Sequence, residues 1–392
     1  MKIKQIYQLI NSINKQMWGE NAISVNDLRD VISLGETLQL NEDDADAFLG
    51  ALVDRIGKTV IRTLDLELDF PNFFMDTFEF GAIMQKINVN PFEAIENSDW
   101  RVGENDFTPT FADVYKPSVI VKYFKGGTTW SYRVTIPSDT FFTAFTSAER
   151  MNTFIDAIME ALTDSMVMSI NNMSRTALCE LIAEKSLNNN GVVDLLALYN
   201  GASGTMTVEE ARRSKEFYRF AGMVIRNYIG YMKEPSKLYN VDGMVRTTAR
   251  DNMHVIMLRD FASGYDAYLS SDTFHKELVE LPLYTEVNHW QGSGQSISFE
   301  NNSKINVTPS SQSEQYIGTD EPVNIELNGV VCVLADRQSI GVGINKRRVG
   351  KFVNDIDNYV NTKTSATIQW FVDLSENAVV FTIGSTTAND GE

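Results

Sequence analysis

The longest regular alternation of apolar and polar positions in the chain runs from about Thr146 to Ser186. Apolar residues recur there mostly at steps of three and four, which is the spacing of one face of an α-helix. They are Met151, Phe154, Ile155, Ile158, Met159, Leu162, Met166, Ile170, Met173, Leu178, Leu181 and Ile182. Thr146 and Glu149 have the spacing of a capping box, and the run 188–191 supplies residues that end helices. The pattern predicts one helix of roughly forty residues, about 60 Å long. It is either the core helix of a coiled coil or bundle, or the spine of a large, flat subunit.

Three shorter helical patterns occupy the first sixty or so residues and are separated by polar breaks. Their apolar positions are Ile6, Leu9, Ile10 and Ile13; then Leu28, Val31 and Ile32 after a start at 24–27; then Phe48, Leu49, Leu52, Val53 and Ile56 after the acidic run 41–44. Stripes this narrow cannot enclose a core alone. We therefore expect this segment to be an arm that lies against something else.

Strand-like alternation follows at 61–76, and several pairs of β-rich runs are joined by turn residues. The clearest predicted hairpin places Gly126-Gly127 between strands 119–125 and 128–134. A second places Asn328-Gly329 between strands 323–327 and 330–334, with a further strand over 337–346. A third joins strands 366–372 and 378–383 through the turn 373–377. Residues 85–117 are less periodic and acidic.

Helices and strands mix between the long helix and residue 330, which predicts a compact α+β unit there. A helix is expected over 207–233 with a capping sequence at Thr207, then a strand over 253–258. A mostly helical stretch from Asp260 to Leu281 should end at Pro282. The polar run 291–315 predicts a loop with little to bury.

Composition narrows the classes of function. The 392 residues are 43% hydrophobic and 22% charged, as in a soluble globular protein with a sizeable core, and the formal charge is −18. This charge argues against general nucleic-acid binding, which depends on Lys and Arg. No window is apolar enough for a membrane helix, and the first residues lack an export signal. We therefore expect a cytoplasmic product in which Cys179 and Cys332 are buried without forming a disulfide.

A search for catalytic or metal-binding motifs finds little. There is no Gly-rich phosphate loop, CxxC, HExxH, EF-hand loop or nucleophile elbow. The histidines His254, His275 and His289 lack the spacing of a metal pair on a helix. Asp260 and Asp266 flank Gly264 and remain the candidates for an α+β enzyme in the 192–330 unit. The basic run 346–348 fits a solvated strand end or a partner contact, and Met166, Met168 and Met173 fit packing.

The order of these parts resembles the major capsid protein of tailed bacteriophages, a Hong Kong 97-like fold shared with encapsulins and herpesvirus shell floors. The local likeness lies in Trp130–Ile136, followed by Phe141–Phe145 and the long helix, and in Ile56–Val60 before the first strand segment. These runs are similar to capsid proteins of short-tailed and gut phages. The resemblance implies an α+β fold with an N-terminal arm, an extended β-hairpin loop, a spine helix, and axial and peripheral domains.

The same resemblance implies five divisions of the chain: an arm (1–75), an extended loop (76–136), a peripheral domain with the spine helix (137–191), an axial domain (192–330) and closing peripheral strands (331–392). It implies a non-enzymatic shell protein of the virion capsid, assembled in the host cytoplasm as hexamers and pentamers. Scaffold and portal proteins would be partners, and double-stranded DNA would be enclosed without sequence-specific binding or a membrane. No catalytic, cofactor-binding or metal residue is expected, and no cofactor. Lys125 is not assigned a crosslink. An encapsulin-like compartment and the enzyme remain alternatives.

Overall fold

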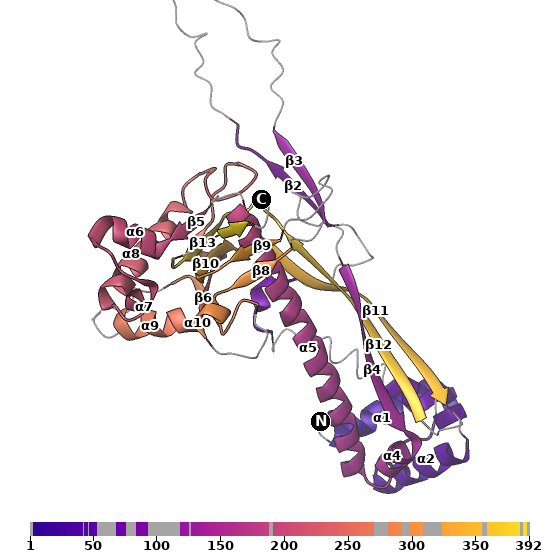
Figure 1. The fold of residues 1–392 in the computed structure, drawn as a ribbon. Helices are drawn as coiled ribbons and strands as arrows, with labels where there is room; N and C mark the ends of the chain where they lie inside the picture. The colour runs from indigo at the N-terminus through magenta and orange to yellow at the C-terminus, as the bar shows by residue number, and fades with distance from the viewer. Residues whose placement is uncertain are drawn as a thin grey trace, which may run out of the picture. The chain divides into compact units, whose positions relative to one another are not determined.

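The computed structural model describes residues 3–41, 43–45, 47–52, 68–75, 84–92, 118–124, 127–187, 191–269, 281–291, 298–308, 324–354, 359–384 and 387–389 (Figure 1). Their contacts divide the chain into two units. Unit 1 comprises residues 1–82, 126–176 and 341–370, and unit 2 comprises 83–125, 177–340 and 371–392. Among the described residues, no helix has the length and apolar character needed to span a membrane.

Unit 1 contains the N-terminal helices, most of the long helix and a four-stranded sheet. Its helices are α1 (Ile3–Trp18), α2 (Leu28–Leu40), α4 (Ser138–Ala144) and the first part of α5 (Ala148–Leu187), with short 3-10 turns at Gly19–Asn21 and Pro71–Phe73. Residues 43–45 and 47–52 are also helical. The predicted start of α2 is confirmed, because the Asp27 side chain accepts hydrogen bonds from the backbone N–H groups of Arg29 and Asp30.

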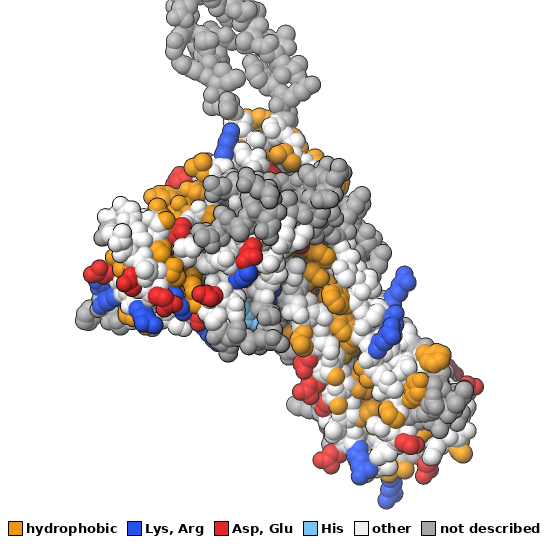
Figure 2. Space-filling model, viewed as in Figure 1, with side chains coloured by type: hydrophobic (Ala, Val, Ile, Leu, Met, Phe, Trp, Pro, Cys, Tyr) orange, Lys and Arg blue, Asp and Glu red, His pale blue; other side chains and the backbone are white. Residues whose placement is uncertain are grey.

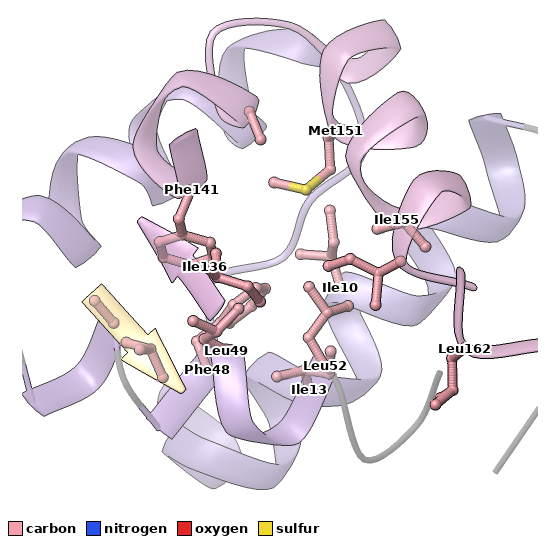
Figure 3. Close-up of a cluster of buried hydrophobic side chains, with 14 of the residues drawn as sticks. Ile10, Ile13, Phe48, Leu49, Leu52, Ile136, Phe141, Met151, Ile155 and Leu162 are labelled. Atoms are coloured by element: carbon pink, nitrogen blue, oxygen red, sulfur yellow. The ribbon is translucent and has the colours of Figure 1, made fainter. Parts of the chain in front are cut away.

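One buried cluster joins the N-terminal helices to α4 and α5 (Figure 3). Its labelled members are Ile10, Ile13, Phe48, Leu49, Leu52, Ile136, Phe141, Met151, Ile155 and Leu162. Phe141 and Phe145 meet edge to face, with ring centroids 5.1 Å apart, and Phe48 lies 5.8 Å from Phe145. Most of the predicted stripe residues of the first three helices are therefore buried in this cluster, namely Ile10, Ile13, Val31, Phe48, Leu49 and Leu52, and Leu9 is partly buried. Ile32 was predicted wrongly, because it is 37% exposed. The side chains of Ile6 and Leu28 lie outside the described residues. Val53 and Ile56 lie outside the described residues.

The sheet of unit 1 has the strand order β1-β11-β12-β4. The strands are β1 (Phe74–Met75), β4 (Gly127–Pro137), β11 (Ile340–Asn354) and β12 (Tyr359–Val372). β12 and β4 are antiparallel and pair from Tyr359 opposite Pro137 to Gln369 opposite Gly127. One face of β12 is buried, through Val360, Thr362, Thr364, Ala366 and Ile368. The predicted strand segment 61–76 is wrong over residues 68–73, where the chain forms a bend and then the 3-10 turn Pro71–Phe73, and residues 61–67 and 76 lie outside the described residues.

Unit 2 is built on a five-stranded mixed sheet with the order β5-β13-β10-β6-β7. The strands are β5 (Val192–Asp194), β6 (Met253–Leu258), β7 (Leu283–Val287), β10 (Val330–Asp336) and β13 (Ala378–Thr382). Every residue of β6, β10 and β13 is buried. A smaller sheet with the order β14-β9-β8 contains β8 (Ile305–Val307), β9 (Ile325–Leu327) and β14 (Thr387–Asn389).

Helices α6, α8 and α9 pack against the larger sheet and bury an aromatic cluster with it (Figure 1). The helices of this unit are α6 (Leu195–Ser203), α7 (Val208–Ala211), α8 (Lys215–Tyr231), α9 (Arg259–Leu269) and α10 (Phe299–Asn302), and a 3-10 turn covers Arg250–Asn252. The capping box of Thr207 with Glu210 is confirmed. The single helix predicted over 207–233 is wrong, because Ser214 caps a new helix by accepting from Phe217 N. The predicted loop 291–315 also contains α10 and β8, where Ile305 is fully buried.

The predicted long helix is confirmed as α5, a single helix of 40 residues. Its predicted capping box is wrong by one residue. Arg150 N donates to Ser147 Oγ (3.1 Å), whereas Thr146 Oγ1 donates to the carbonyl oxygen of Thr143 (2.7 Å). The hydroxyl of Thr146 therefore satisfies a carbonyl oxygen at the end of α4, and Ser147 is the residue that caps α5.

All three predicted hairpins are wrong, although their strands exist. β3 (Val119–Phe124) pairs with β2 (Met84–Val89) in unit 2, whereas β4 pairs with β12 in unit 1. β10 has β6 and β13 on its two edges, and β12 has β11 and β4 on its own. A strand with both edges paired leaves no edge for its neighbour in sequence. The three connecting segments therefore carry the chain from one sheet to another.

Gly329 shows why a turn sequence misled the prediction. Its φ is +75°, and a Cβ there would lie 2.4 Å from the carbonyl oxygen of Ile383. The backbone N–H of Ile383 donates to the carbonyl oxygen of Gly329 (2.8 Å). A glycine is needed because the backbone of Ile383, just after β13, comes this close to residue 329, and not because the chain makes a two-residue turn.

We expect Gly35→Ala to destabilise the chain. A Cβ at Gly35 in α2 would lie 2.5 Å from Cβ of Phe145, and neither backbone can yield easily. Overpacking of this kind costs about 1–3 kcal/mol, more than the gain of roughly 1 kcal/mol that alanine brings to a helix.

Gly230→Ala in α8 is the matched control, because a Cβ there meets nothing within 4 Å. It should leave stability unchanged or raise it. Urea unfolding of both variants measures the difference, and equal stability of Gly35→Ala and the wild type would contradict the packing of α2 on Phe145.

Candidate functional site

Strands β2 and β3 of unit 2 form a two-stranded ribbon that is separate from its larger sheets. The strands are antiparallel and pair from Met84 opposite Phe124 to Val89 opposite Val119. Side chains alternate between the two faces of such a ribbon. The sequence prediction missed β2, although Lys86-Ile87-Asn88-Val89 alternates as a strand should.

The outward face of the ribbon is apolar. Ile87 pairs with Val121, and Val89 pairs with Val119. The exposed fractions on this face are 58% for Ile87, 47% for Val89, 44% for Val119, 41% for Val121 and 61% for Tyr123. Phe92, just beyond β2, is 75% exposed. Figure 2 shows hydrophobic side chains at the surface over β2 and β3.

The inward face of the ribbon is polar and charged at its centre and ends in the buried ring of Phe124, which is 7% exposed. Asn88 is 3% exposed and Lys122 is 1% exposed. Lys86 and Lys122 lie directly opposite each other on this face. At Lys86, Asn88 and Lys122 the ribbon therefore inverts the usual arrangement of a half-buried strand, in which apolar residues face the core and polar residues face water.

Asp373, which is fully buried, lies between the two lysines. Lys86 Nζ lies 2.5 Å from Asp373 Oδ2, and Lys122 Nζ lies 3.3 Å from Asp373 Oδ1. Lysines opposite each other on a ribbon repel unless an anion compensates them. Asp373 supplies that anion to both strands at once.

Two further carboxylates complete the cluster. Lys122 also pairs with Asp242, and Lys86 Nζ lies 2.8 Å from Glu376 Oε1. Arg246 Nη2 lies 3.5 Å from the same Glu376 oxygen. The three cations and three anions balance, which a cluster removed from water requires.

The turn that carries Asp373 is itself ordered by hydrogen bonds. Asp373 Oδ1 accepts from the backbone N–H (3.0 Å) and the hydroxyl (2.6 Å) of Ser375. Asn88 Nδ2 on the ribbon donates to Ser375 Oγ (2.7 Å), and the rings of Phe124 and Phe371 lie 4.9 Å apart. The base of the ribbon is therefore fixed by ion pairs, a hydrogen bond and a ring contact.

Electrostatics favour the charged form of Asp373. Burial alone would raise the pKa of this carboxyl, but the ammonium groups of Lys86 and Lys122 and the Ser375 hydroxyl lower the pKa below its ordinary value. The ion pairs therefore persist at every pH near neutrality.

Lys185 extends the charged region from the end of α5. Its Nζ donates to the carbonyl oxygen of Tyr239 (2.6 Å). Burial lowers the pKa of Lys185 to about 7, although the Asp242 carboxylate acts in the opposite direction. The side chain can therefore exchange a proton near neutral pH.

The residues proposed from sequence for an enzyme are not brought together. Asp260 and Asp266 both lie on α9, six residues apart, so their side chains diverge by about 120° around the helix axis. Asp260 Oδ2 accepts from Asn302 Nδ2 (3.2 Å). Burial and the Glu286 carboxylate raise the pKa of Asp266. Neither residue lines the cavity of about 680 Å³ between α7, α10 and the turn at Gly329.

The histidines and cysteines show no shared site among the described residues. His254 is buried, with one ring nitrogen 2.8 Å from Thr285 Oγ1, and burial with Arg337 lowers its pKa to about 4. Cys179 and Cys332 are free and buried, as predicted. His275 and Lys125 lie outside the described residues. The described part of the chain has no group of three metal-ligating side chains.

The chain is similar to known phage capsid proteins in sequence and in fold. The profile of the Phi29-like phage major capsid protein family matches residues 10–382. The chain belongs to this family. A curated relative, the major capsid protein of Streptococcus phage Cp-1, is 49% identical over 49 residues, which are 12% of this chain and 13% of that protein.

Solved structures show the same fold. A chain in the capsid structure of Staphylococcus phage Andhra matches with a TM-score of 0.53 and 11% identity, covering 80% of this chain and 83% of that one. A chain in the structure of head fiber and inner core protein gp22 of native bacteriophage P68 matches with a TM-score of 0.51 and 12% identity, covering 81% and 85%. The predicted α+β fold of a phage capsid protein is thereby confirmed.

We expect Asp373→Asn to destabilise the chain strongly. The substitution keeps the shape but removes the carboxylate shared by the two facing lysines, so that Glu376 and Asp242 alone face the three cations of the cluster, of which Lys122 is 1% exposed. Removing one partner of a buried ion pair typically costs about 3–5 kcal/mol.

Asp69→Asn is the matched control in this capsid-family chain. Its partner Arg175 lies 3.0 Å away, but Asp69 is 47% exposed, and such surface pairs contribute about 0–1 kcal/mol. Urea unfolding measures both changes. A loss for Asp373→Asn as small as that for Asp69→Asn would contradict the role of the cluster.

We expect Lys185 to make stability depend on pH above neutrality. Below about pH 7, Lys185 is protonated in both the folded and the unfolded chain, so the free-energy cost of burying its charge does not change with pH. Between about pH 7 and pH 10, Lys185 binds more protons in the unfolded chain than in the folded chain, so the free energy of unfolding rises with pH.

Comparison with Lys185→Met isolates this contribution, because all other groups titrate alike in both chains. In urea unfolding at several pH values between 7 and 9, the free energy of unfolding of the wild type should rise relative to that of Lys185→Met by at most ~1.4 kcal/mol per pH unit. Parallel curves of the free energy of unfolding against pH for Lys185→Met and the wild type would exclude the shift.

Proposed function

We propose that this chain is a major capsid protein whose copies assemble into the icosahedral shell around a double-stranded DNA phage genome. The apolar outward face of the β2–β3 ribbon is the observation that carries this proposal. Family membership and the capsid-protein fold support it. No observation favours an encapsulin-like compartment or an enzyme.

The ribbon needs a partner surface for physical reasons. A two-stranded ribbon is marginal in water, and extended apolar patches on soluble proteins mark contact sites. Its inward face is already occupied by the ionic cluster, so only the outward face, with Ile87 and Val121, is available to a second molecule. A second copy of this chain fits that role, because each copy then offers one ribbon and receives one.

Such contacts become effective through repetition. A head-to-tail contact between different surfaces of identical subunits closes into a ring when its rotation permits. Each contact can be weak, because every subunit makes several at once and the effective concentration is high. We infer rings of six and five copies, the hexamers and pentamers of an icosahedral shell.

The five divisions of the chain remain part of the proposal. Residues 1–75 would be the arm, 76–136 the extended loop, 137–191 and 331–392 the peripheral domain, and 192–330 the axial domain. The β2–β3 ribbon lies within the proposed extended loop. Its exposed apolar face supports this assignment.

Partners and location follow from the same role. Scaffold and portal proteins would take part in assembly in the host cytoplasm, and the product would be the virion capsid. The charge of −18 suits a shell that encloses DNA without gripping it. No catalytic step is part of this function.

We expect Ile87→Asp combined with Val121→Lys to abolish assembly and leave the subunit folded. These side chains are 58% and 41% exposed and lie directly opposite each other, so the substitutions place opposite charges across the strands, whereas a contact with a second copy would have to bury two charged groups. Electron microscopy and light scattering, under conditions in which the unsubstituted chain forms shells, rings or tubes, give the result.

Leu238→Asp is the control, because Leu238 is 68% exposed in unit 2 but lies outside the ribbon. Circular dichroism should show the helix content and melting point of all variants to be close to wild type. Normal particles from the double variant would refute the assembly role of the ribbon.

A further inference from the structure

One side of α5 in unit 1 lies at the surface. Thr153, Ala157, Glu160 and Asp164 are all exposed, and their spacing of three and four residues places them in one stripe along the helix. Met168, four residues further on, is 64% exposed, so the prediction that it is a packing residue is wrong. The stripe from Thr153 to Met168 is about 22 Å long.

A hollow of about 530 Å³ lies at the start of this stripe, between α4 and the first turns of α5. Its lining includes Thr143 of α4 and Thr153, Phe154 and Ala157 of α5. The two threonine hydroxyls are satisfied within their own helices, because each donates to the carbonyl oxygen four residues before it, at 2.6 Å for Thr143 and 3.0 Å for Thr153. Methyl groups and a phenyl ring therefore make the lining mostly apolar.

The stripe carries negative charge that α5 itself does not compensate. Asp156, Glu160 and Asp164 follow one another at intervals of four residues, and α5 has no Lys or Arg between Arg150 and Arg175. Like charges at this spacing destabilise a helix. Neither Glu160 nor Asp164 forms an ion pair with another described residue. Figure 2 shows Asp and Glu side chains at the surface along α5.

We propose that this surface binds a basic amphipathic helix of a second protein. The inference rests on the proposed shell assembly and gives the proposed scaffold partner a binding site. One apolar side chain of that helix enters the hollow beside Ala157, basic side chains meet Glu160 and Asp164, and a further apolar side chain contacts Met168. Helices that bind such surfaces present apolar anchors every three or four residues, and a methionine adapts its flexible side chain to them.

The occupant is a different protein, because no helix of the described chain fits. Helix α1 is basic, with Lys4, Lys15 and no acidic residue, but it buries its apolar residues Ile10 and Ile13 in its own unit. Helix α8 carries three basic residues and one acidic residue, and its apolar face is buried in unit 2. The other described helices have no excess of basic residues. Nucleic acid does not fit either, because its phosphates would meet carboxylates.

The test uses a fluorescent synthetic peptide of about 18 residues, built of leucine and lysine in the pattern of an amphipathic helix. Its binding to the full-length chain is measured by fluorescence anisotropy. Glu160→Lys with Asp164→Lys should weaken binding by about tenfold or more, because attraction becomes repulsion. The same variant should instead bind the corresponding peptide of leucine and glutamate.

Two further variants separate the site from net charge. Glu20→Lys with Glu36→Lys makes the same change of net charge at exposed positions of unit 1 and should leave binding of the leucine–lysine peptide nearly unchanged. Ala157→Trp fills the hollow and should weaken this binding without lowering the melting point, because Ala157 is exposed.

Folding is checked with a single neutral substitution. Glu160→Gln removes a repulsion within α5, so its melting point should equal or exceed that of the wild type, while peptide binding falls about two- to fivefold. A lower melting point accompanying the weaker binding would overturn the proposal, because the carboxylate would then serve the fold.

Four other results would overturn the proposal. Unchanged peptide binding to Glu160→Lys with Asp164→Lys would place the peptide elsewhere. An equal loss in Glu20→Lys with Glu36→Lys, or equal binding of a scrambled peptide of the same composition, would show attraction by net charge alone. Failure of Glu160→Lys with Asp164→Lys to form particles, where the unsubstituted chain assembles alone, would identify a second copy as the occupant.

Peptide binding does not require shells, so its outcome is separate from that of the ribbon test. Normal particles from Ile87→Asp with Val121→Lys would refute the ribbon contact and leave this binding site standing. Loss of particles in that variant, with no peptide binding to the stripe of the unsubstituted chain, would support the ribbon contact and refute the site.

Discussion

A single buried carboxylate determines how the β2–β3 ribbon is oriented. Asp373 has no exposure to water and lies within ion-pair distance of Lys86 and Lys122, which face each other across the ribbon. Without it, the two ammonium groups would repel and the inward face could not leave water. With it, the charged face of the ribbon becomes the buried one.

The apolar outward face is a direct consequence. Side chains on a strand alternate with a period of two, so burying Lys86, Asn88 and Lys122 forces Ile87, Val89 and Val121 outward. An ordinary ribbon would bury these apolar residues and would offer nothing to a partner. The ionic cluster therefore both anchors the ribbon and creates its contact surface, which links the fold of the subunit to its assembly.

Local patterns in the sequence predicted local structure well. The stripe along α5, the start of α2 within 24–27 and the Thr207 capping box depend on residues close in sequence, and all are confirmed, whereas the Thr146 capping box is wrong by one residue. The predicted hairpins failed because strand pairing depends on which edges distant strands occupy. The ionic cluster was missed for the same reason, since residues as far apart as Lys86, Asp242 and Asp373 form it and no local spacing reports them.

The two cationic cross-strand pairs of the chain pose the same physical problem and differ in how it is solved. Lys86 and Lys122 have their carboxylate inside the subunit, fully buried and supplied by the turn after β12. Arg133 and Lys363 are exposed on the polar face of β4 and β12, and no carboxylate of the described residues pairs with them. The carboxylate allows the fold to bury the first pair, whereas the second pair stays in water, where solvent and salt screen its repulsion.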